Sequence, residues 1–323
     1  MRPLISIIMP VFCTPKEILS RSLESAITQS FEDIEIIVVD DSPVENSCEA
    51  IIKPFEARDD RIVYISHDGN LGTLEARRTG VINASGKYIL YFDPDDELTN
   101  ETCEILYNAA KKNKANIVQC GAIINVLENI PEQRHKGLLS CEEGFTLGLL
   151  TGEEIARNCF LEGGHNKFIW SKLIDADLCR RALNEIPRVY CVLTEDLLIY
   201  FFVSIYAKRY FGIPEKLYQY NIADGISVPR REYSLEDWSK LCTCSHVFII
   251  IISWIQTKQK RTELEDILLT MMMHEMRLGL LMLQKQISDE LRPRAYEIFC
   301  EMWGEEYVKK VEKKMAGEGK KAE

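Results

Sequence analysis

The stretch Tyr88-Ile-Leu-Tyr-Phe-Asp-Pro-Asp-Asp96 decides the fold class of this 323-residue chain. Its first five residues are apolar and rich in strand-forming types, which is typical of a strand buried on both faces. Three carboxylates follow at the point where this strand ends. In open parallel sheets, ligands bind beyond the carboxyl ends of the strands, so the acidic loop is a candidate binding site.

The chain before this stretch alternates strand and helix signals. Strands are predicted at residues 4–9, 35–39 and 61–66, and helices at residues 18–29, 44–57 and 74–84. Such alternation produces parallel βαβ units, whose sheet is covered by helices on both faces. We therefore predict an α/β fold with a mostly parallel central sheet flanked by helices.

The pattern of apolar residues changes near residue 234, where strand signals end and apolar helical runs follow. We predict an α/β domain over residues 1–233 and a helical extension over residues 234–323. The last ten or so residues are mostly charged and are expected to be flexible. The most apolar run, at 246–255, is shorter than the roughly 18 to 20 residues that cross a bilayer, so we interpret it as a buried core helix.

Composition excludes several classes of function. The net charge of −11 argues against nucleic-acid binding, which depends on clustered Lys and Arg. Eleven scattered cysteines and an N-terminus unlike a secretory signal favour reduced thiols in a cytoplasmic protein. Cys242, Cys244 and His246 lack a second ligand pair at zinc-finger spacing, so we interpret them as part of a buried helix face.

The acidic loop favours a bound divalent metal. Asp93, Asp95 and Asp96 repel one another unless a positive charge neutralises them. Carboxylate oxygens suit Mg²⁺ or Mn²⁺, which substrate phosphates would share. The alternative is a solvated turn, or a helix N-cap formed by Asp95 and Asp96. The position directly after a buried strand favours the metal.

Two further carboxylates lie in suggestive positions. Asp41 follows the strand at 35–39 and could accept hydrogen bonds from a nucleobase or ribose, or could cap the next helix. Asp196, in Thr194-Glu-Asp196, precedes a long apolar run and could act as a general base or as an N-cap. For Asp196 the residues alone favour capping.

The order of these motifs resembles that of the family 2 glycosyltransferases, bacterial enzymes with the GT-A fold. The resemblance covers roughly the first 230 residues, and its joint order is far more specific than any one motif. The segments that carry it are Ser6–Phe12, Gln29-Ser-Phe31, Asn70-Leu-Gly72, Ala76-Arg77, Ala84–Tyr88, the acidic loop, Trp170-Ser-Lys-Leu173 and Thr194-Glu-Asp196.

The resemblance implies an inverting, metal-dependent transferase of the hexosyltransferase type that uses a nucleotide-sugar donor. By position, Pro10, Phe12 and Asp41 would hold the uracil and ribose of a UDP-type donor, and Arg77 would lie near the diphosphate. Asp93 and Asp95 match the family's DxD motif, and Asp95 would contact the Mn²⁺ or Mg²⁺ ion directly. Asp196 would be the base that deprotonates the acceptor hydroxyl.

The chain departs from the family pattern at several positions. Phe12 stands where the family often has Tyr, and Arg78 replaces a frequent Asn. The segment Tyr220–Ser227 lacks the family's usual Arg and His, so the third metal contact is unassigned. Substitutes for that contact are Asn221, Asp224 and Ser227.

These departures keep other functions open. The main alternative is a degenerate member that binds nucleotide or serves as a scaffold without turnover. A nucleotidyltransferase ranks last, because residues 10–15 do not form a Gly-rich phosphate loop.

The expected acceptor is a glycan, a lipid-linked sugar or a protein, in surface-glycan or glycoprotein biosynthesis. The C-terminal helices would pack on the first domain or form a homodimer. Contact with the inner face of the cell membrane is a weaker option, because glutamates are interleaved with the lysines of the C-terminal region. Those lysines are Lys309, Lys310, Lys313 and Lys314.

Overall fold

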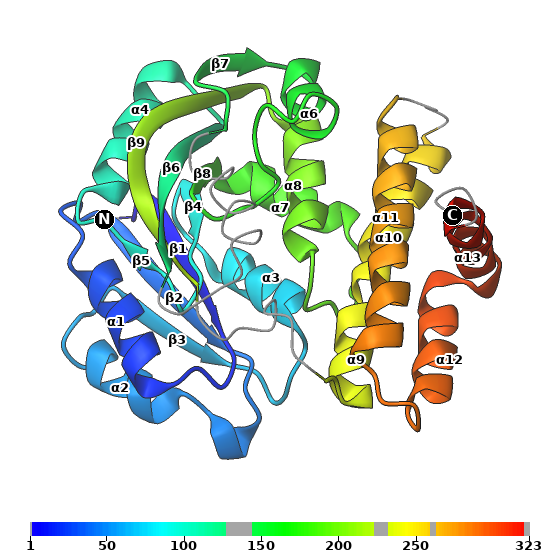
Figure 1. Cartoon of the computed structure of the whole chain (residues 1–323). Coiled ribbons are helices and arrows are strands. Elements are labelled where there is room, and N and C mark those ends of the chain that lie inside the picture. Colours follow the sequence, from blue (N-terminus) through cyan, green and yellow to red (C-terminus); the bar gives the residue numbers. More distant parts are fainter. Residues whose placement is uncertain (1, 127–143, 223–231, 259–262, 320–323) are drawn as a thin grey trace. The chain divides into compact units, whose positions relative to one another are not determined.

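The computed structural model describes residues 2–126, 144–222, 232–258 and 263–319 (Figure 1). The chain divides into two compact units. The first contains Met1–Arg188 and Ile199–Gly225, and the second contains Val189–Leu198 and Ile226–Glu323. The first unit therefore ends nearer residue 225 than residue 233, and it does not include residues 189–198.

Within the described residues, the first unit is built on a nine-stranded sheet in the order β3-β2-β1-β4-β8-β6-β9-β5, with β7 paired to β9. The α/β fold class is confirmed. The strands are β1 Ile5–Val11, β2 Ile34–Asp40, β3 Ile62–Ser66, β4 Tyr88–Tyr91, β5 Glu97–Leu98, β6 Ile117–Val126, β7 Gly148–Thr151, β8 Lys172–Asp175 and β9 Arg209–Ile222.

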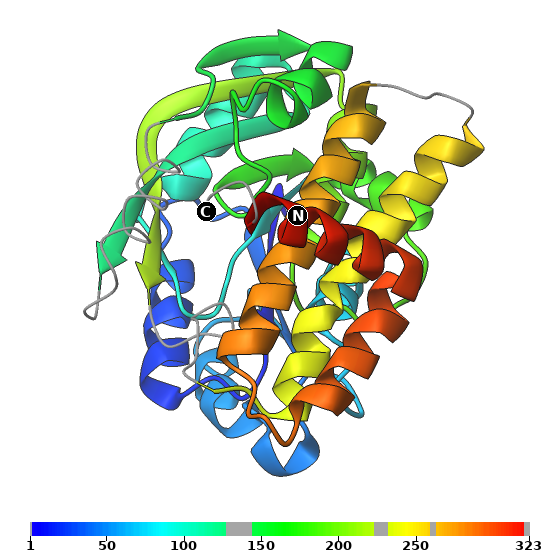
Figure 2. The ribbon, with the colours of Figure 1, turned by 45° about the vertical axis from the view of Figure 1, so that its right-hand side comes forward.

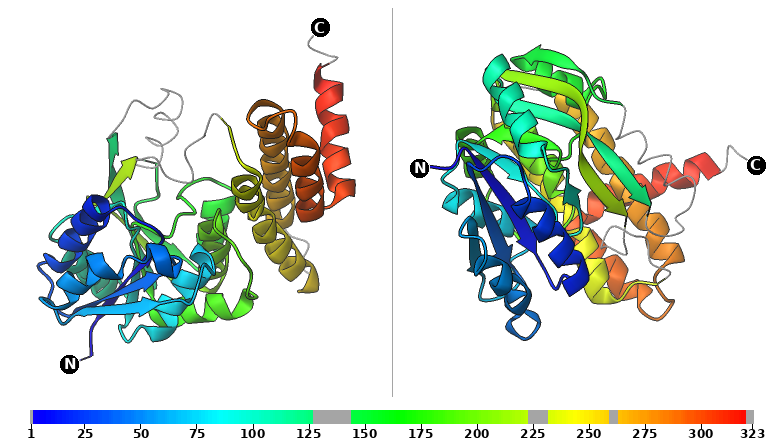
Figure 3. Two further views of the ribbon diagram at one scale, coloured as in Figure 1. Left: turned by 90° about the horizontal axis from the view of Figure 1, so that it is seen from below. Right: turned by 90° about the vertical axis from the view of Figure 1, so that its left-hand side faces the viewer.

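Only part of this sheet follows the predicted parallel pattern. β3, β2, β1 and β4 are parallel to one another, as expected for successive βαβ units. β8 is antiparallel to both β4 and β6, whereas the long strands β6 and β9 are parallel and run side by side (Figure 3, right). The apolar runs of these later strands mark burial but carry no signal of direction, so the mixed half of the sheet was not predicted.

Helices cover both faces of the sheet in the first unit (Figure 1). On one face, alternate residues of β1 such as Ile7 and Met9 share a core with Leu19 of α1 and Leu106 of α4. The helices assigned to this unit are α1 Lys16–Ile27, α2 Glu49–Glu56, α3 Thr73–Asn83, α4 Thr102–Asn113, α6 Glu153–Phe160, α7 Ala176–Glu185 and most of α8 Glu195–Tyr206, with a short 3-10 turn at Val44–Asn46.

Helix α3 packs very closely on the other face of β1. A Cβ atom at Gly80 would lie only 2.3 Å from Cγ2 of Ile8, so the helix can approach this closely only with glycine at that position. This packing matters for the site, because α3 also carries Arg77. The next residue, Arg78, has a structural role. Its guanidinium donates to the carbonyls of Leu183 and Ile186 at the end of α7.

A neutral histidine is buried in the first unit. The ring of His165 is stacked on Tyr210, and its nitrogens pair with Asn158 Oδ1 and the Tyr200 hydroxyl, each at 2.7 Å. Burial, together with the nearby charge of Lys172, lowers the pKa of His165 to about 3. The unfolded chain binds a proton at this residue near pH 6.5 and the folded chain does not.

We expect this histidine to make folding pH-dependent. As pH falls below 6.5, only the unfolded state takes up the proton, so the free energy of unfolding decreases by about 1.4 kcal/mol per pH unit until pH nears 3. Urea unfolding at pH 7 and pH 5 should therefore show about 2 kcal/mol more loss in the wild type than in His165→Gln. Equal losses in the two proteins would contradict this account.

The second unit contains helices that lie side by side (Figure 2). The helices are α9 Leu235–Cys242, α10 Cys244–Thr257, α11 Glu263–Lys285, α12 Arg292–Trp303 and α13 Glu305–Gly319. The indole of Trp238 in α9 is buried and donates to the Ala295 carbonyl of α12 at 2.8 Å. The interpretation of 246–255 as a core helix agrees with the burial of Val247, Phe248 and Ile251.

Two expectations for this region need correction. Within the described residues, one helical stretch, Leu235–Thr257, is long and apolar enough to cross a membrane by length and composition, because α9 and α10 are nearly continuous. Its window is 44% buried, and a core helix passes the same test. The chain is also helical up to Gly319, because Val308 and Val311 are buried and Glu305 pairs with Lys309.

Candidate functional site

The site lies where the parallel strands of the first unit end. Val11, the last residue of β1, pairs with Asp40, the last residue of β2, and the Asp41 amide donates to the Val11 carbonyl at 2.8 Å. This register places Phe12 and Asp41 beside each other, after strand ends at the same edge. β4 is parallel to β1 on its other side and leads into the acidic loop.

We call the group formed by Phe12, Asp41, His67, Arg77, Asp93 and Asp95 the sheet-edge site. All of these residues belong to the first unit.

Asp96 has a structural role in the acidic loop. It is fully buried, and its carboxyl accepts the Tyr218 hydroxyl at 2.7 Å and the Asn221 amide at 2.8 Å. Burial and the nearby charges of Asp95 and Asp93 raise its pKa well above the ordinary value. Asp96 thus fastens the acidic loop to β9, and it is not the carboxylate that a ligand would meet.

The other two carboxylates of the loop remain closer to solvent. Asp93 Oδ1 accepts from Arg77 Nη2 at 2.9 Å, and the guanidinium of Arg77 is almost completely buried. Asp95 is partly buried, and burial together with the charge of Asp93 raises its pKa to about 6. A raised carboxyl pKa means that a cation placed here would relieve an unfavourable charge.

The loop fits a metal that is completed by substrate. Within the described ranges, no group of three or more His, Cys, Asp or Glu side chains is placed to hold a metal ion. Asp95 and Asp93 together supply two carboxylates, which suits Mg²⁺ or Mn²⁺ bound through one or two carboxylates, substrate phosphates and water.

The proposed third contact is constrained by the fold. Asn221 donates its amide nitrogen to the Asp95 carbonyl at 2.9 Å, and its amide oxygen accepts from Asn125 at 2.9 Å. Its side chain is therefore committed to joining β9 to the acidic loop. The other two candidates, Asp224 and Ser227, lie outside the described residues.

The two aspartates after β2 have separate tasks. The Asp40 carboxylate accepts the amides of Ser42 and Cys48 and so fixes the turn before α2. The Asp41 carboxylate instead accepts the amides of Leu71 and Gly72, each at 2.8 Å, and Nδ1 of His67 at 2.7 Å. Asp41 therefore shapes the loop that leads into α3, and it does not cap the helix after β2, since α2 has no side-chain cap among the described residues.

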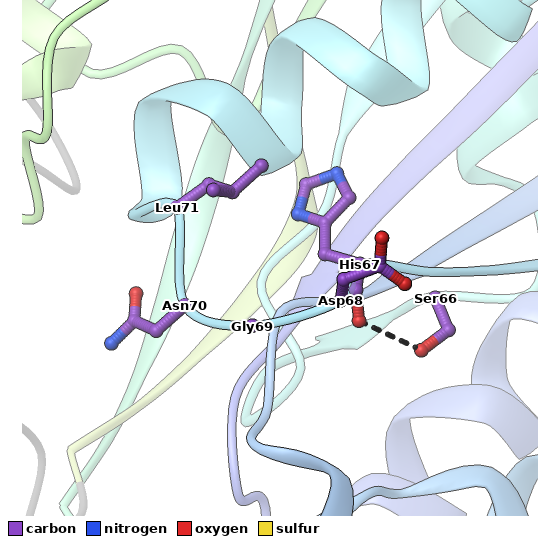
Figure 4. A pocket seen from close by; sticks show the side chains of 6 residues that line it. All are labelled: Ser66, His67, Asp68, Gly69, Asn70 and Leu71. Atoms are coloured by element: carbon purple, nitrogen blue, oxygen red, sulfur yellow. Dashed lines mark hydrogen bonds between the residues drawn. The ribbon is translucent and has the colours of Figure 1, made fainter.

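A hollow of about 460 Å³ opens beside this loop, lined by residues 66–71 (Figure 4). The imidazole of His67 stands at this hollow, directly after the end of β3. Pro10 is buried within β1, whereas the Phe12 ring is 45% exposed at the turn that follows. An exposed aromatic ring at a ligand-binding edge is suited to stacking on a planar base.

His67 is a site residue that the sequence analysis did not select. Its only sequence signal is its position, directly after a predicted strand whose end meets the same edge. Its two partners, Asp41 and Thr79, lie 26 and 12 residues away along the chain. No local spacing rule connects residues that far apart.

Asp196 belongs to the second unit, at the start of α8. It is half-buried in the first turn of the helix, next to Glu195, which is buried. Thr194 precedes them with φ of 65°, an unusual conformation for a β-branched residue. Such strain persists where the surrounding structure holds it, and it is most frequent at functional sites.

Backbone strain occurs in three motif segments. The described chain has four non-glycine residues with positive φ. Cys13 follows Phe12, Ser171 follows Trp170, and Thr194 precedes the Glu195-Asp196 pair. The fourth, Lys114, is the ordinary left-handed C-cap of α4.

Trp170 and Lys172 are interior residues. Trp170 is stacked on Phe168 and Tyr220, with ring centroids 5.1 Å apart in both pairs. The Lys172 ammonium is fully buried, donates to Asn166 Oδ1 at 2.5 Å and lies over the Tyr200 ring. This motif therefore stabilises the first unit beneath the acidic loop.

The cysteine–histidine grouping of the second unit is not a metal site within the described residues. Burial raises the pKa of Cys242 to about 12 and that of Cys244 still further, so both stay protonated thiols. His246 Nδ1 is 3.2 Å from the Tyr190 carbonyl oxygen, an ordinary helix-to-loop contact.

Comparison with known proteins places this geometry in context. A family model described as glycosyl transferase family 2 matches residues 6–176. The cholesterol galactosyltransferase of Borreliella burgdorferi is 31% identical over 205 residues, which cover 61% of this chain and 54% of that protein. Glycosyltransferase GlyA of Streptococcus pneumoniae is 39% identical over 113 residues, covering 35% of this chain and 16% of that protein.

The fold is also shared with solved structures. The S. aureus TarS 1–349 structure in complex with UDP superposes with a TM-score of 0.59 at 14% identity, covering 94% of this chain and 82% of that one. The corresponding complex with UDP-GlcNAc gives a TM-score of 0.56. At this identity the likeness shows the fold alone, and the sequence matches span about half or less of either relative named above.

Proposed function

Because the chain belongs to glycosyl transferase family 2, we propose that it transfers a sugar from a UDP-sugar to an acceptor hydroxyl, with inversion and with a divalent metal. The observation that carries this proposal is the sheet-edge site. It joins an exposed aromatic ring at Phe12, a buried cation at Arg77 and two carboxylates at Asp93 and Asp95. These are the groups that a base, a diphosphate and a phosphate-bound cation require.

The donor would lie across the sheet edge. Phe12 would stack on the uracil, and Asp41 would accept a hydrogen bond from the base or the ribose. Asp93 and Asp95 would hold Mn²⁺ or Mg²⁺, which supplies positive charge next to the departing diphosphate. Arg77, held in place by Asp93 and by the close packing of α3, would add a second positive charge there.

The proposed transfer is a direct displacement at the anomeric carbon of the donor sugar. An acceptor oxygen attacks the anomeric carbon as the bond from that carbon to the diphosphate oxygen breaks, and UDP leaves with the electron pair. Asp196 takes the proton from the acceptor hydroxyl. Attack from the side opposite the leaving group inverts the anomeric centre.

Supporting observations come from the relatives. One is named as a galactosyltransferase, and TarS has been solved with UDP and with UDP-GlcNAc. The UDP and UDP-GlcNAc complexes of TarS favour a uridine donor for this chain as well. The acceptor proposed is a surface glycan, a lipid-linked sugar or a glycoprotein.

Calorimetric titration of the protein with UDP, GDP and CMP tests the donor assignment. With Mn²⁺ present we expect UDP to bind at least about tenfold more tightly than either control, a difference of about 1.4 kcal/mol. Without Mn²⁺ we expect weaker UDP binding, because the two phosphates then face Asp93 and Asp95 without a cation between them. Failure of all three nucleotides to bind would favour the scaffold alternative.

A further inference from the structure

His67 joins three elements around the sheet-edge site. Its Nδ1 lies 2.7 Å from Asp41 Oδ1, and its Nε2 lies 2.9 Å from the hydroxyl of Thr79 on α3. The side chains of His67 and Asp41 are only 9% and 4% exposed. Since a carboxylate can only accept, His67 donates from Nδ1, and this bond fixes the orientation of the ring.

The bond has a direct consequence for Asp41. A carboxylate has about four acceptor positions, and the described contacts fill three of them. Oδ1 accepts from the Leu71 amide and from His67, whereas Oδ2 accepts only from the Gly72 amide. Oδ2 therefore keeps one acceptor position, and His67 helps to decide which oxygen keeps it.

The remaining acceptor position on Asp41 Oδ2 can distinguish one nucleobase from another. A buried carboxylate oxygen accepts N–H groups and rejects other acceptors, since an unpaired buried polar group is costly. Uracil carries an N–H at ring position 3, whereas cytosine has a bare acceptor nitrogen there. A fixed Asp41 thus favours uridine over cytidine nucleotides, and a mobile one would discriminate less.

We propose that His67 is a positioning residue that orients Asp41 and thereby sets both the affinity and the base preference of the donor site. The proposal rests on the proposed function, because it requires a nucleotide at Asp41. His67 itself need not touch the donor. The same carboxylate also holds Leu71, its neighbour in the hollow, through the Leu71 amide.

Two near-isosteric variants each keep one of the two hydrogen bonds of His67 and remove the other. The amide nitrogen of His67→Asn can take the place of Nδ1 and still donate to Asp41. The amide of His67→Gln reaches the place of Nε2, so it can still meet Thr79 but leaves Asp41 without its third donor. A role that is only structural would be reported by the unfolding temperature, which should fall similarly in both variants.

The test measures the affinities of UDP and CDP by calorimetry with Mn²⁺, beside the unfolding temperature of each protein. We expect His67→Gln to weaken UDP binding about tenfold and to reduce the preference for UDP over CDP. We expect His67→Asn to stay within about threefold of the wild type in both quantities.

Two results would overturn the inference alone, without overturning the proposed function. One is unchanged UDP affinity and base preference in His67→Gln while the wild type binds UDP normally, and this leaves the proposed function intact. The other is an equal loss in both variants that follows their unfolding temperatures. A wild type that binds neither nucleotide overturns this inference and the proposed function together.

Discussion

Replacing Asp196 with asparagine is expected to lower the rate of sugar transfer by about 10³-fold, within the 10² to 10⁴ that a positioned general base contributes. Asparagine matches aspartate in shape but cannot take a proton from the acceptor hydroxyl. Because the base proposed here acts on the acceptor and not on the donor, UDP binding should remain within about threefold of the wild type. The assay is release of UDP from a panel of UDP-sugars with Mn²⁺, with simple sugars as acceptors.

The neighbouring carboxylate provides the matched control. Glu195 is buried in the same first turn of α8, and Glu195→Gln removes one charge at almost constant shape. We expect this variant to retain most of the transfer rate. If Glu195→Gln were the inactive protein and Asp196→Asn the active one, the base would have been assigned to the wrong residue.

The turn before Asp196 has a strained conformation that its sequence does not indicate. The pattern of Thr194-Glu-Asp196 before an apolar run matches an ordinary N-cap, and capping was the favoured interpretation from the residues alone. The structure shows Thr194 at a φ of 65°, which that pattern does not indicate. The conformation of one residue depends on the contacts around it, which a local pattern does not contain.

The parallel half of the fold was predictable because burial leaves a strong mark. β1, β2 and β4 are buried along nearly their whole length, so their sequences read as continuous apolar runs. The antiparallel insertion of β8 between β4 and β6 was not predictable. Its four residues, Lys172–Asp175, include a buried lysine, which hides the apolar signal of the strand.

The position of the candidate site was predictable from sequence, but the separate structural roles of its neighbouring aspartates were not. Asp40 lies at the end of β2 and Asp41 directly follows it, and both Asp95 and Asp96 follow Asp93. Without the family resemblance, the residues alone therefore do not distinguish the members of each pair. Tertiary hydrogen bonds separate them: Asp40 fixes the turn before α2, and Asp96 is tied to Tyr218, 122 residues later in the chain. Those long-range partners are what single-sequence reasoning lacks.

Asp95→Asn is expected to abolish the part of UDP binding that depends on Mn²⁺, a loss of about 100-fold or 2.7 kcal/mol at saturating metal. Asp95 is only partly buried, and burial beside Asp93 makes its negative charge unfavourable without a cation. A neutral amide removes both the strongest oxygen ligand and the charge that attracts the ion. Titration with UDP, with and without Mn²⁺, measures the loss directly.

Asp96→Asn is the matched control for this result, because it makes the same change one residue away. Its amide oxygen can still accept from the Asn221 amide, and its nitrogen can donate to the Tyr218 hydroxyl oxygen in place of the bond that Asp96 now accepts. Burial already raises the pKa of Asp96 well above the ordinary value, so this residue contributes little charge to a metal. Mn²⁺-dependent UDP binding should therefore survive in Asp96→Asn. Loss in Asp96→Asn with retention in Asp95→Asn would mean that the buried carboxyl, reached only after the loop rearranges, is the true ligand.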